Sequence, residues 1–170
     1  MVPELRRRVG KKDRSGGTPA TVALTRAGIG FTLRAYDHDP AAESYGLEAA
    51  TALGVEPERV LKTLLVSVDG NLVVGIVPVS GQLDLKAVAS AVGGKRAEMA
   101  DPKLAERTTG YVVGGISPVG QRKQLPTVLD ESALGFDTVL VSGGKRGLDL
   151  ELSPHDLVRV TAATVAPIGR

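Results

Sequence analysis

The stretch that most constrains the fold is a nearly unbroken apolar, β-branched run at residues 60–68, closed by the dipeptide Asp69-Gly70. Its length, its β-branched content and the Asp-Gly turn signal predict a buried strand that enters a hairpin, and they disfavour a helix. Because alternate residues of a strand share a face, Lys62 is expected beside Val60, Leu64 and two further valines. The run therefore places a lysine on the most apolar face of the predicted sheet.

A lysine in this position costs free energy unless its ammonium group has a partner or opens into a cleft. One interpretation makes Lys62 the cation of a ligand site. The other makes it a residue at the mouth of the sheet, with a packed stem and an ammonium group that reaches water. Since structural ion pairs also perturb lysines, this stretch alone leaves both interpretations open.

The composition of the chain excludes several classes of protein. A length of 170 residues suits one domain with a single sizeable core. Three Tyr, two Phe and no Trp disfavour an extended platform for stacking the bases of single-stranded nucleic acid. The absence of cysteine excludes disulfides, a cysteine nucleophile, iron–sulfur clusters and thiolate zinc sites. With only His38 and His155 and no HExxH motif, no metal is expected and no other cofactor is indicated.

No apolar run reaches membrane-spanning length, and the N-terminus lacks the apolar core of a signal peptide. We therefore expect no membrane association and a cytoplasmic location. The net charge of +2 hides an asymmetry, because residues 1–17 hold six basic and two acidic residues while the rest of the chain carries −2. The predicted organisation is a basic flexible tail at 1–17 and a single domain at 18–170. The tail either attracts nucleic-acid phosphates or is a solvated extension.

Short elements follow one another in irregular order along the chain. Strands are predicted at 31–36, 60–68, 72–78, 96–99, 110–113, 125–130, 138–142 and 148–152, with a closing strand at 162–165; helices are predicted at 20–27, 43–53, 83–92, 102–107 and 154–160, and a loop at 131–137. Strict βα alternation and a repeat of 20–50 residues are both missing, which disfavours a doubly wound sheet. The pattern predicts an α+β fold, a mixed and strongly bent β-sheet or small barrel with peripheral helices.

The loop Gly114-Gly115-Ile116-Ser117-Pro118 is the most informative loop of the chain. Two glycines after a predicted strand allow a sharp turn that presents backbone N–H groups to a carbonyl or carboxylate oxygen. An ordinary glycine turn is the alternative. A nucleophilic Ser117 is disfavoured, because the spacing is not GxSxG and no histidine is placed to activate the hydroxyl.

The loop Gly143-Gly144-Lys145-Arg146-Gly147 resembles a phosphate loop only superficially, since Arg146 stands where the Walker A motif needs a hydroxyl residue. Two adjacent cations on a glycine bend still suit a phosphate or a nucleic-acid backbone. The alternative is a solvated hairpin tip.

The pair Asp149 and Glu151, and the separate residue His38, each have a structural and a functional interpretation. Asp149 and Glu151 alternate with leucines, which is typical of a half-exposed strand with a polar face. Neighbours on one strand face lie too close to flank a scissile glycosidic bond from opposite sides, so glycosidase chemistry is disfavoured. His38, between Asp37 and Asp39-Pro40, is typical of a turn, and a role in a site stays open.

Taken together, an ordered set of motifs resembles the YbaK/EbsC family of free-standing aminoacyl-tRNA deacylases, which is related to the editing domain of bacterial prolyl-tRNA synthetases. The motifs are Tyr36-Asp37-His38-Asp39-Pro40, Lys62-Thr63-Leu64-Leu65, Gly81-Gln82-Leu83-Asp84-Leu85-Lys86, Glu98-Met99-Ala100-Asp101-Pro102, Thr109-Gly110-Tyr111, Gly114-Gly115-Ile116-Ser117-Pro118, Leu125-Pro126-Thr127 and Val141-Ser142-Gly143-Gly144-Lys145-Arg146-Gly147-Leu148-Asp149. They span residues 18–165 in the family's order and are closest to the Cys-tRNA(Pro) deacylase branch.

The resemblance implies a mixed β-barrel ringed by helices and hydrolysis of the ester that joins a wrong amino acid to tRNA. It implies that Lys62 is the central functional residue, orienting the substrate. It implies that Tyr36, the Gly114-Gly115-Ile116-Ser117-Pro118 loop and Asp149 line the substrate pocket. We also predict His38 and Thr63 among the substrate-binding residues, and we expect Lys145 and Arg146, with Lys62, to position tRNA phosphates. Members of the cysteine-specific type are thought to use the substrate's own sulfhydryl as the attacking group, so no protein nucleophile is required.

The leading hypothesis is therefore a trans-acting deacylase of mischarged tRNA, most directly Cys-tRNA(Pro), with the loop amides stabilising the carbonyl oxygen. An Ala-tRNA(Pro)-type deacylase and a non-catalytic module that binds tRNA or a synthetase are the alternatives. The implied partners are aminoacyl-tRNA and prolyl-tRNA synthetase.

Overall fold

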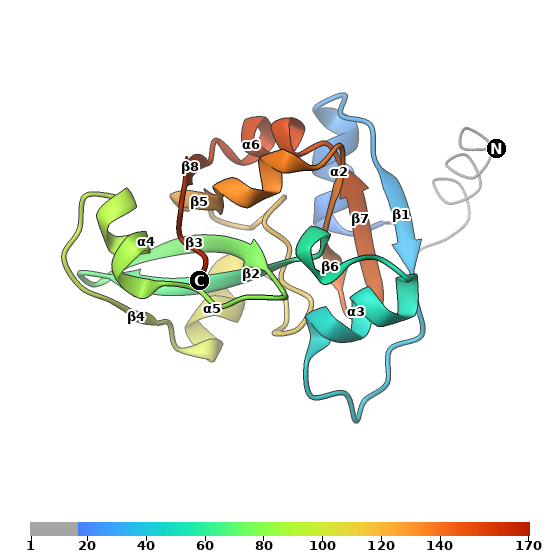
Figure 1. Ribbon diagram of the computed structural model, residues 1–170, viewed down its shortest axis with the longest axis horizontal. Helices are drawn as coiled ribbons and strands as arrows, with labels where there is room; N and C mark the ends of the chain where they lie inside the picture. Colours follow the sequence, from blue (N-terminus) through green and yellow to red (C-terminus); the bar gives the residue numbers. More distant parts are fainter. Residues whose placement is uncertain (1–16) are drawn as a thin grey trace.

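The computed structural model describes residues 17–170, so all but the last residue of the predicted basic tail lies outside the described residues. The described chain forms two β-sheets with helices around them, and the strands of the larger sheet run nearly across those of the smaller one (Figure 1). This arrangement confirms the α+β class. In the described part of the chain the strand pairing gives two open sheets and closes no barrel.

The larger sheet has five strands in the order β4-β2-β3-β5-β8. These are β4 (Ala97–Met99), β2 (Leu61–Val68), β3 (Asn71–Pro78), β5 (Thr127–Asp130) and β8 (Thr164–Ala166). The predicted hairpin is confirmed, because β2 and β3 pair antiparallel along their full lengths. Asp69 and Gly70 join them with φ angles of 50° and 89°, the left-handed pair that a two-residue type I′ turn requires.

The smaller sheet has three antiparallel strands in the order β1-β7-β6, namely β1 (Thr32–Ala35), β7 (Leu148–Leu152) and β6 (Val139–Lys145). The two sheets meet where Val60, just before β2, pairs with Leu140 of β6. The Val60 carbonyl accepts the Val79 amide on the β3 side. Leu140 therefore occupies the other edge of β2, which is the edge that β4 occupies further along.

Five α-helices and two 3₁₀-helices surround the sheets in the described residues. They are α2 (Pro19–Arg26), α3 (Tyr45–Leu53), α4 (Leu85–Ala91), α5 (Pro102–Thr109), α6 (Pro154–Thr161), η2 (Pro57–Arg59) and η3 (Glu131–Gly135). Each α-helix begins after a Ser, Thr or Asp whose side chain accepts an amide of the first turn. None of the helices described between residues 17 and 170 is long and apolar enough to cross a membrane.

Two sequence predictions are wrong in detail. The predicted strand at 110–113 is absent, because the backbone groups of Val113 bond to side chains instead of to a neighbouring strand. Its amide donates to Glu106 Oε2 at 2.8 Å and its carbonyl accepts from Arg146. The loop predicted at 131–137 contains η3, which Asp130 caps through the Ser132 amide.

Helix α3 packs on the junction of the two sheets. Ala49 and Ala50 of α3 form a buried cluster with Val60 and Leu140, the pair that joins the sheets. Their small side chains let the helix approach closely. This contact fixes the first turn of α3 beside β2, where the cavity described next is found.

Candidate active site

A cavity of about 380 Å³ opens where β2 loses its neighbour on one edge. Strand β4 pairs only with Val66–Val68, and the last contact on this edge is the Ala100 amide to the Leu65 carbonyl. Leu140 bonds to the same edge only at Val60. The gap between these contacts is lined by Tyr36, Glu43, Ser44, Tyr45, Gly46, Ala49, Val60, Leu61, Lys62, Thr63, Leu64, Leu65, Met99, Ala100, Pro102, Ala105, Val113, Gly114, Ile116, Ser142 and Asp149.

Lys62 is half-buried and lines this cavity from the middle of the gap. It forms no ion pair with any residue in the described part of the chain. The lysine therefore borders a cleft, and its role as the cation of a ligand site stays a prediction. Thr63 also lines the cavity, because the cavity wraps around the open edge of the strand. Its Oγ1 is buried without a hydrogen-bond partner.

Asp149 of β7 lies opposite Ser142 of β6 in the strand register, and both residues line the cavity. Only 6% of Asp149 is exposed, so the predicted half-exposed polar face is wrong at this position. Burial raises the pKa of the Asp149 carboxyl to about 7, against a smaller lowering by the Arg34 charge. The carboxyl group is thus near the midpoint of its titration at neutral pH.

Glu151, two residues further along β7, has a different environment. Its carboxylate accepts hydrogen bonds from Arg34, Arg59 and Thr138. Burial raises its pKa, but these hydrogen bonds and the two positive charges lower it more, and the net shift is downward. Glu151 is a structural anion of the small sheet and does not line the cavity.

Tyr36 follows β1 and reaches the cavity wall. Its amide donates to the Gly147 carbonyl at 2.9 Å, which fixes the end of β1 to the β6–β7 turn. Burial and the nearby Asp149 charge raise the pKa of the phenol to about 12. The hydroxyl therefore stays protonated at neutral pH and keeps a proton that it can donate in a hydrogen bond.

The glycine loop contributes two of its five predicted residues, Gly114 and Ile116, to the cavity wall. The other three residues serve the loop itself. The Gly115 amide donates to the Val112 carbonyl at 2.8 Å, so it does not face a ligand. Ser117 is fully buried and its Oγ accepts the Val119 amide.

Pro118 is buried and has no N–H to offer. The amides of Gly114 and Ile116 donate no hydrogen bond to any described residue. Since Ser117 does not line the cavity, the candidate oxygen-binding amides of the loop are those of Gly114 and Ile116.

Arg146 fixes this loop against helix α3. Its guanidinium donates to the Val113 carbonyl and lies 5.0 Å from the ring centroid of Tyr45. Lys145, the neighbouring cation, is exposed and does not line the cavity. It forms no ion pair with any residue in the described chain. The roles predicted for both residues toward tRNA phosphates stay predictions.

His38 lies outside the cavity lining. Its Nδ1 is 2.8 Å from Glu48 Oε1, and its ring is 5.8 Å from the Tyr45 ring. A second hydrogen bond, from the Asp39 amide to Glu48, closes the turn and lowers the pKa of the Glu48 carboxyl. These contacts fix the loop before α3, which agrees with the turn interpretation of His38.

Several cavity residues were not singled out from the sequence, above all Ser142 and Tyr45. A regular hairpin that pairs Lys145 with Leu148 would put Ser142 across from Glu151. A β-bulge at Gly143 and Gly144 shifts the pairing by two residues, so that Ser142 lies across from Asp149 instead, and counting along the sequence does not reveal this. No sequence pattern indicated Tyr45 as a cavity residue, since its position depends on how α3 packs against the sheets. Among residues 17–170 no three His, Asp or Glu side chains gather as a set of metal ligands.

Comparison with known proteins identifies the family. The family model described as the aminoacyl-tRNA editing domain matches residues 39–160. The chain is 43% identical over 120 residues to EbsC of Enterococcus faecalis, named as a Cys-tRNA(Pro)/Cys-tRNA(Cys) deacylase, and the match covers 70% of this chain and 73% of that protein. It is 29% identical over 142 residues to the multifunctional Ser/Thr-tRNA deacylase ProXp-y of Escherichia coli K12, over 81% and 83% of the two chains.

A solved structure described as a trans-editing enzyme for prolyl-tRNA synthetase superimposes with a TM-score of 0.77 at 28% identity, over 100% of this chain and 99% of that one. These matches confirm the resemblance inferred from the ordered motifs, and the chain belongs to the aminoacyl-tRNA editing domain family.

Proposed function

We propose that this protein is a trans-acting deacylase that cleaves the ester of mischarged tRNA, with Cys-tRNA(Pro) as its substrate. The observation that carries the proposal is the shared cavity, which Lys62, Asp149, Gly114 and Ile116 all line. The backbone amides of Gly114 and Ile116 donate no hydrogen bond to any described residue. The similarity to EbsC supports the choice of cysteine.

The chemistry needs a site that stabilises negative charge on the ester carbonyl oxygen. Preorganised N–H donors and a nearby ammonium group lower the free energy of such a transition state. The Gly114 and Ile116 amides suit the carbonyl oxygen, and Lys62 orients the substrate. The protonated Tyr36 phenol is a further donor in the same wall.

The attacking group is the thiol of the substrate's own cysteine. Its sulfur forms a bond to the carbonyl carbon, the bond from that carbon to the ribose oxygen breaks, and the thiol proton ends on the ribose hydroxyl. Water then opens the cyclic thioester. The Ser117 hydroxyl is not required, which agrees with its burial against Val119.

The test is a release assay with three tRNA(Pro) substrates charged with cysteine, alanine or 2-aminobutyrate. The last amino acid has the size of cysteine with a methyl group in place of the thiol. We expect release of cysteine and no release of 2-aminobutyrate.

Equal release of cysteine and 2-aminobutyrate would contradict the thiol step, and preferential release of alanine would assign the protein to the Ala-tRNA(Pro) type. Serine and threonine belong in the same assay, because ProXp-y is named for those substrates. Binding without any release would identify a non-catalytic module. A dependence on added prolyl-tRNA synthetase would support that enzyme as partner, which, like the cytoplasmic location, stays a prediction.

A further inference from the structure

A second hollow of about 930 Å³ lies beside helix α5 and is separate from the cavity. It runs between the β2–β3 turn, the end of α4 and the segment that leads into β5. Its walls are Val68, Asp69, Gly70, Asn71, Leu72, Val73, Val92, Gly93, Gly94, Leu104, Arg107, Thr108, Arg122, Lys123, Gln124, Leu125 and Pro126. We refer to this hollow as the α5 groove.

Helix α5 forms a wall of both hollows. Pro102 and Ala105 line the cavity, whereas Leu104, Arg107 and Thr108 line the α5 groove. The spacing of three and four residues within the second set is that of one helix face. The eight residues of α5 rise about 12 Å, so the two hollows lie on two sides of one short helix.

The α5 groove carries an excess of unpaired positive charge. Arg107, Arg122 and Lys123 are exposed in its wall, and none of them forms an ion pair with a residue between 17 and 170. The single acidic side chain of the wall, Asp69, accepts the amides of Lys95 and Arg96, which lower the pKa of its carboxyl.

Backbone hydrogen bonds join the two segments that carry these cations. The Arg122 amide donates to the Thr109 carbonyl at 2.8 Å, and the Lys123 amide donates to the Thr108 carbonyl at 3.3 Å. The segment with two of the cations is therefore tied to the last turn of the helix with the third. A scaffold that carries cations without carboxylate partners is suited to a chain of phosphates, because it binds by charge without reading bases.

We propose that the α5 groove binds the phosphate backbone of the tRNA whose charged end occupies the cavity. This inference rests on the proposed function. Lys103, exposed between the cavity-lining Pro102 and the groove, continues the line of positive charge. The groove wall holds no aromatic residue, so it makes backbone contacts and no base stacking.

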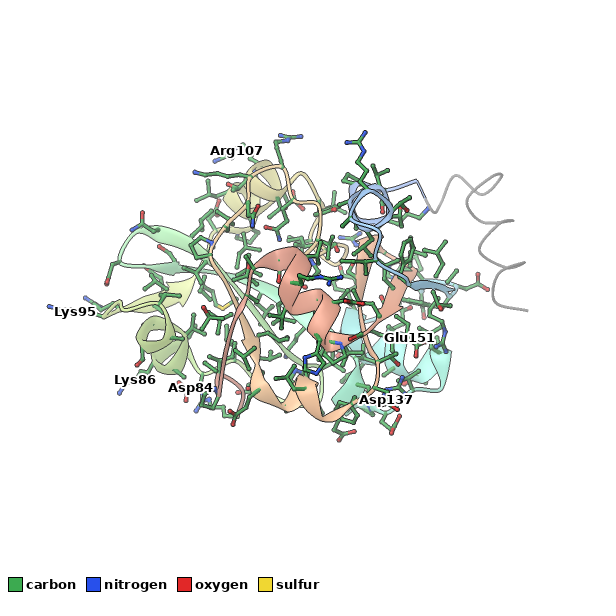
Figure 2. The ribbon with its side chains drawn as sticks, turned by 90° about the horizontal axis from the view of Figure 1, so that it is seen from above. Asp84, Lys86, Lys95, Arg107, Asp137 and Glu151 are labelled. Carbon is green, nitrogen blue, oxygen red and sulfur yellow. The ribbon has the colours of Figure 1, made fainter. Side chains whose placement is uncertain are left out.

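The experiment compares two double variants that remove the same charge. Arg107→Gln/Lys123→Gln removes two groove cations while it leaves Arg122, which donates to the Arg107 carbonyl, in place. Arg26→Gln/Lys86→Gln is the control, because both residues are exposed and line neither hollow. Figure 2 shows Arg107 and Lys86 at different edges of the molecule.

Binding is measured with uncharged tRNA(Pro) by fluorescence anisotropy over a series of salt concentrations. We expect the groove variant to raise the dissociation constant about tenfold and to reduce the slope of log K against log salt by about 2, as for two lost phosphate contacts. The control variant should match the wild type. Both variants should retain the melting temperature of the wild type.

A cysteinyl ester of the terminal trinucleotide separates the groove from the chemistry. The groove variant should cleave this short ester at the wild-type rate while its KM for full-length Cys-tRNA(Pro) rises. If wild-type protein cleaved neither ester, the proposed function would fail while the binding result still tested the groove. Equal affinity of the groove and control variants for tRNA would overturn the inference. It would equally be overturned if the groove variant lost affinity only for an acidic protein such as a synthetase.

Discussion

The guanidinium of Arg146 donates two hydrogen bonds to the carbonyl oxygen of Val113, from Nε at 2.9 Å and from Nη2 at 2.6 Å. The same guanidinium lies over the Tyr45 ring. One side chain from the β6–β7 turn therefore fixes the loop that leads into Gly114 to the first turn of α3. Since the loop and Tyr45 both line the cavity, Arg146 determines the shape of its wall without being part of the lining.

Replacing Arg146 with lysine should lower kcat/KM about tenfold. Lysine keeps the charge but lacks the planar fork that satisfies one carbonyl twice and stacks on a ring. Single-turnover kinetics should show the loss in the rate of cleavage. Lys145→Ala, at the exposed neighbouring position, is the control and should keep the cleavage rate. A loss in tRNA affinity alone, larger at low salt than at high salt, would instead favour the predicted phosphate contact of Arg146.

Lys62→Ala should abolish deacylation while the protein stays folded. The side chain is half-buried and has no ion pair in the described chain, so its removal leaves no unpaired partner charge. Ester release is followed together with the melting temperature. Lys62→Arg tests whether charge alone is sufficient, and we expect little rescue because the guanidinium differs in size and geometry. Turnover of the alanine variant at the wild-type rate would refute the role of Lys62.

Asp149→Asn should change the pH dependence of stability. The folded-state pKa of about 7 lies above the usual 3.8, so the folded protein holds a proton that the unfolded chain releases. Folding stability from this group is therefore lost as pH rises from about 4 to about 7, by up to about 4 kcal/mol. The asparagine variant should lack this loss. Denaturant unfolding at pH 5, 6, 7 and 8 measures the difference.

Glu151→Gln is the opposite control for that experiment. Its folded-state pKa is lowered, so its contribution to stability is present at neutral pH and is lost as pH falls through the folded pKa. The glutamine variant should thus be less stable than the wild type at pH 7. If the stability of the Asp149 and Glu151 variants, relative to the wild type, changed with pH in the same direction, the opposite pKa shifts of the two carboxyl groups would be contradicted.

Gly115→Ala should destabilise the protein by about 1–3 kcal/mol through overpacking. A Cβ at this position would lie 2.7 Å from the Lys145 Cα and 2.9 Å from the Arg146 nitrogen, both backbone atoms. The loop and the β6–β7 turn would have to separate. Gly135→Ala, where an added Cβ meets nothing within 4 Å, is the matched control. Equal melting temperatures of the two variants would show that the loop adjusts freely.

Thr63→Val should raise the free energy of unfolding and lower activity. The buried Thr63 hydroxyl has no hydrogen-bond partner, and an isosteric methyl group removes the cost of that desolvated oxygen, about 1 kcal/mol. Thr63→Ser, which keeps the hydroxyl, separates the two effects in unfolding and release assays. If the valine variant kept full activity, the hydroxyl would have no part in the reaction.

The sequence predicted most elements because their signals are local. Asp69-Gly70 adopts the turn that its own backbone preferences favour, and the residue types before each helix cap it regardless of distant contacts. The failure at 110–113 has the opposite cause. The backbone groups of Val113 are bonded by Glu106 and Arg146, and no local signal shows that side chains from elsewhere take these bonds.

The chain by itself determined the class of fold, the hairpin with Lys62 and the family, because periodicity, turn residues and motif order are properties of the sequence. The tertiary structure decided which of those residues share a cavity. Asp149 changes from a polar strand residue to a buried acid only because β1, β6 and the open edge of β2 enclose it. Burial and an electrostatic environment depend on what packs around a residue, and that is settled only when distant segments meet.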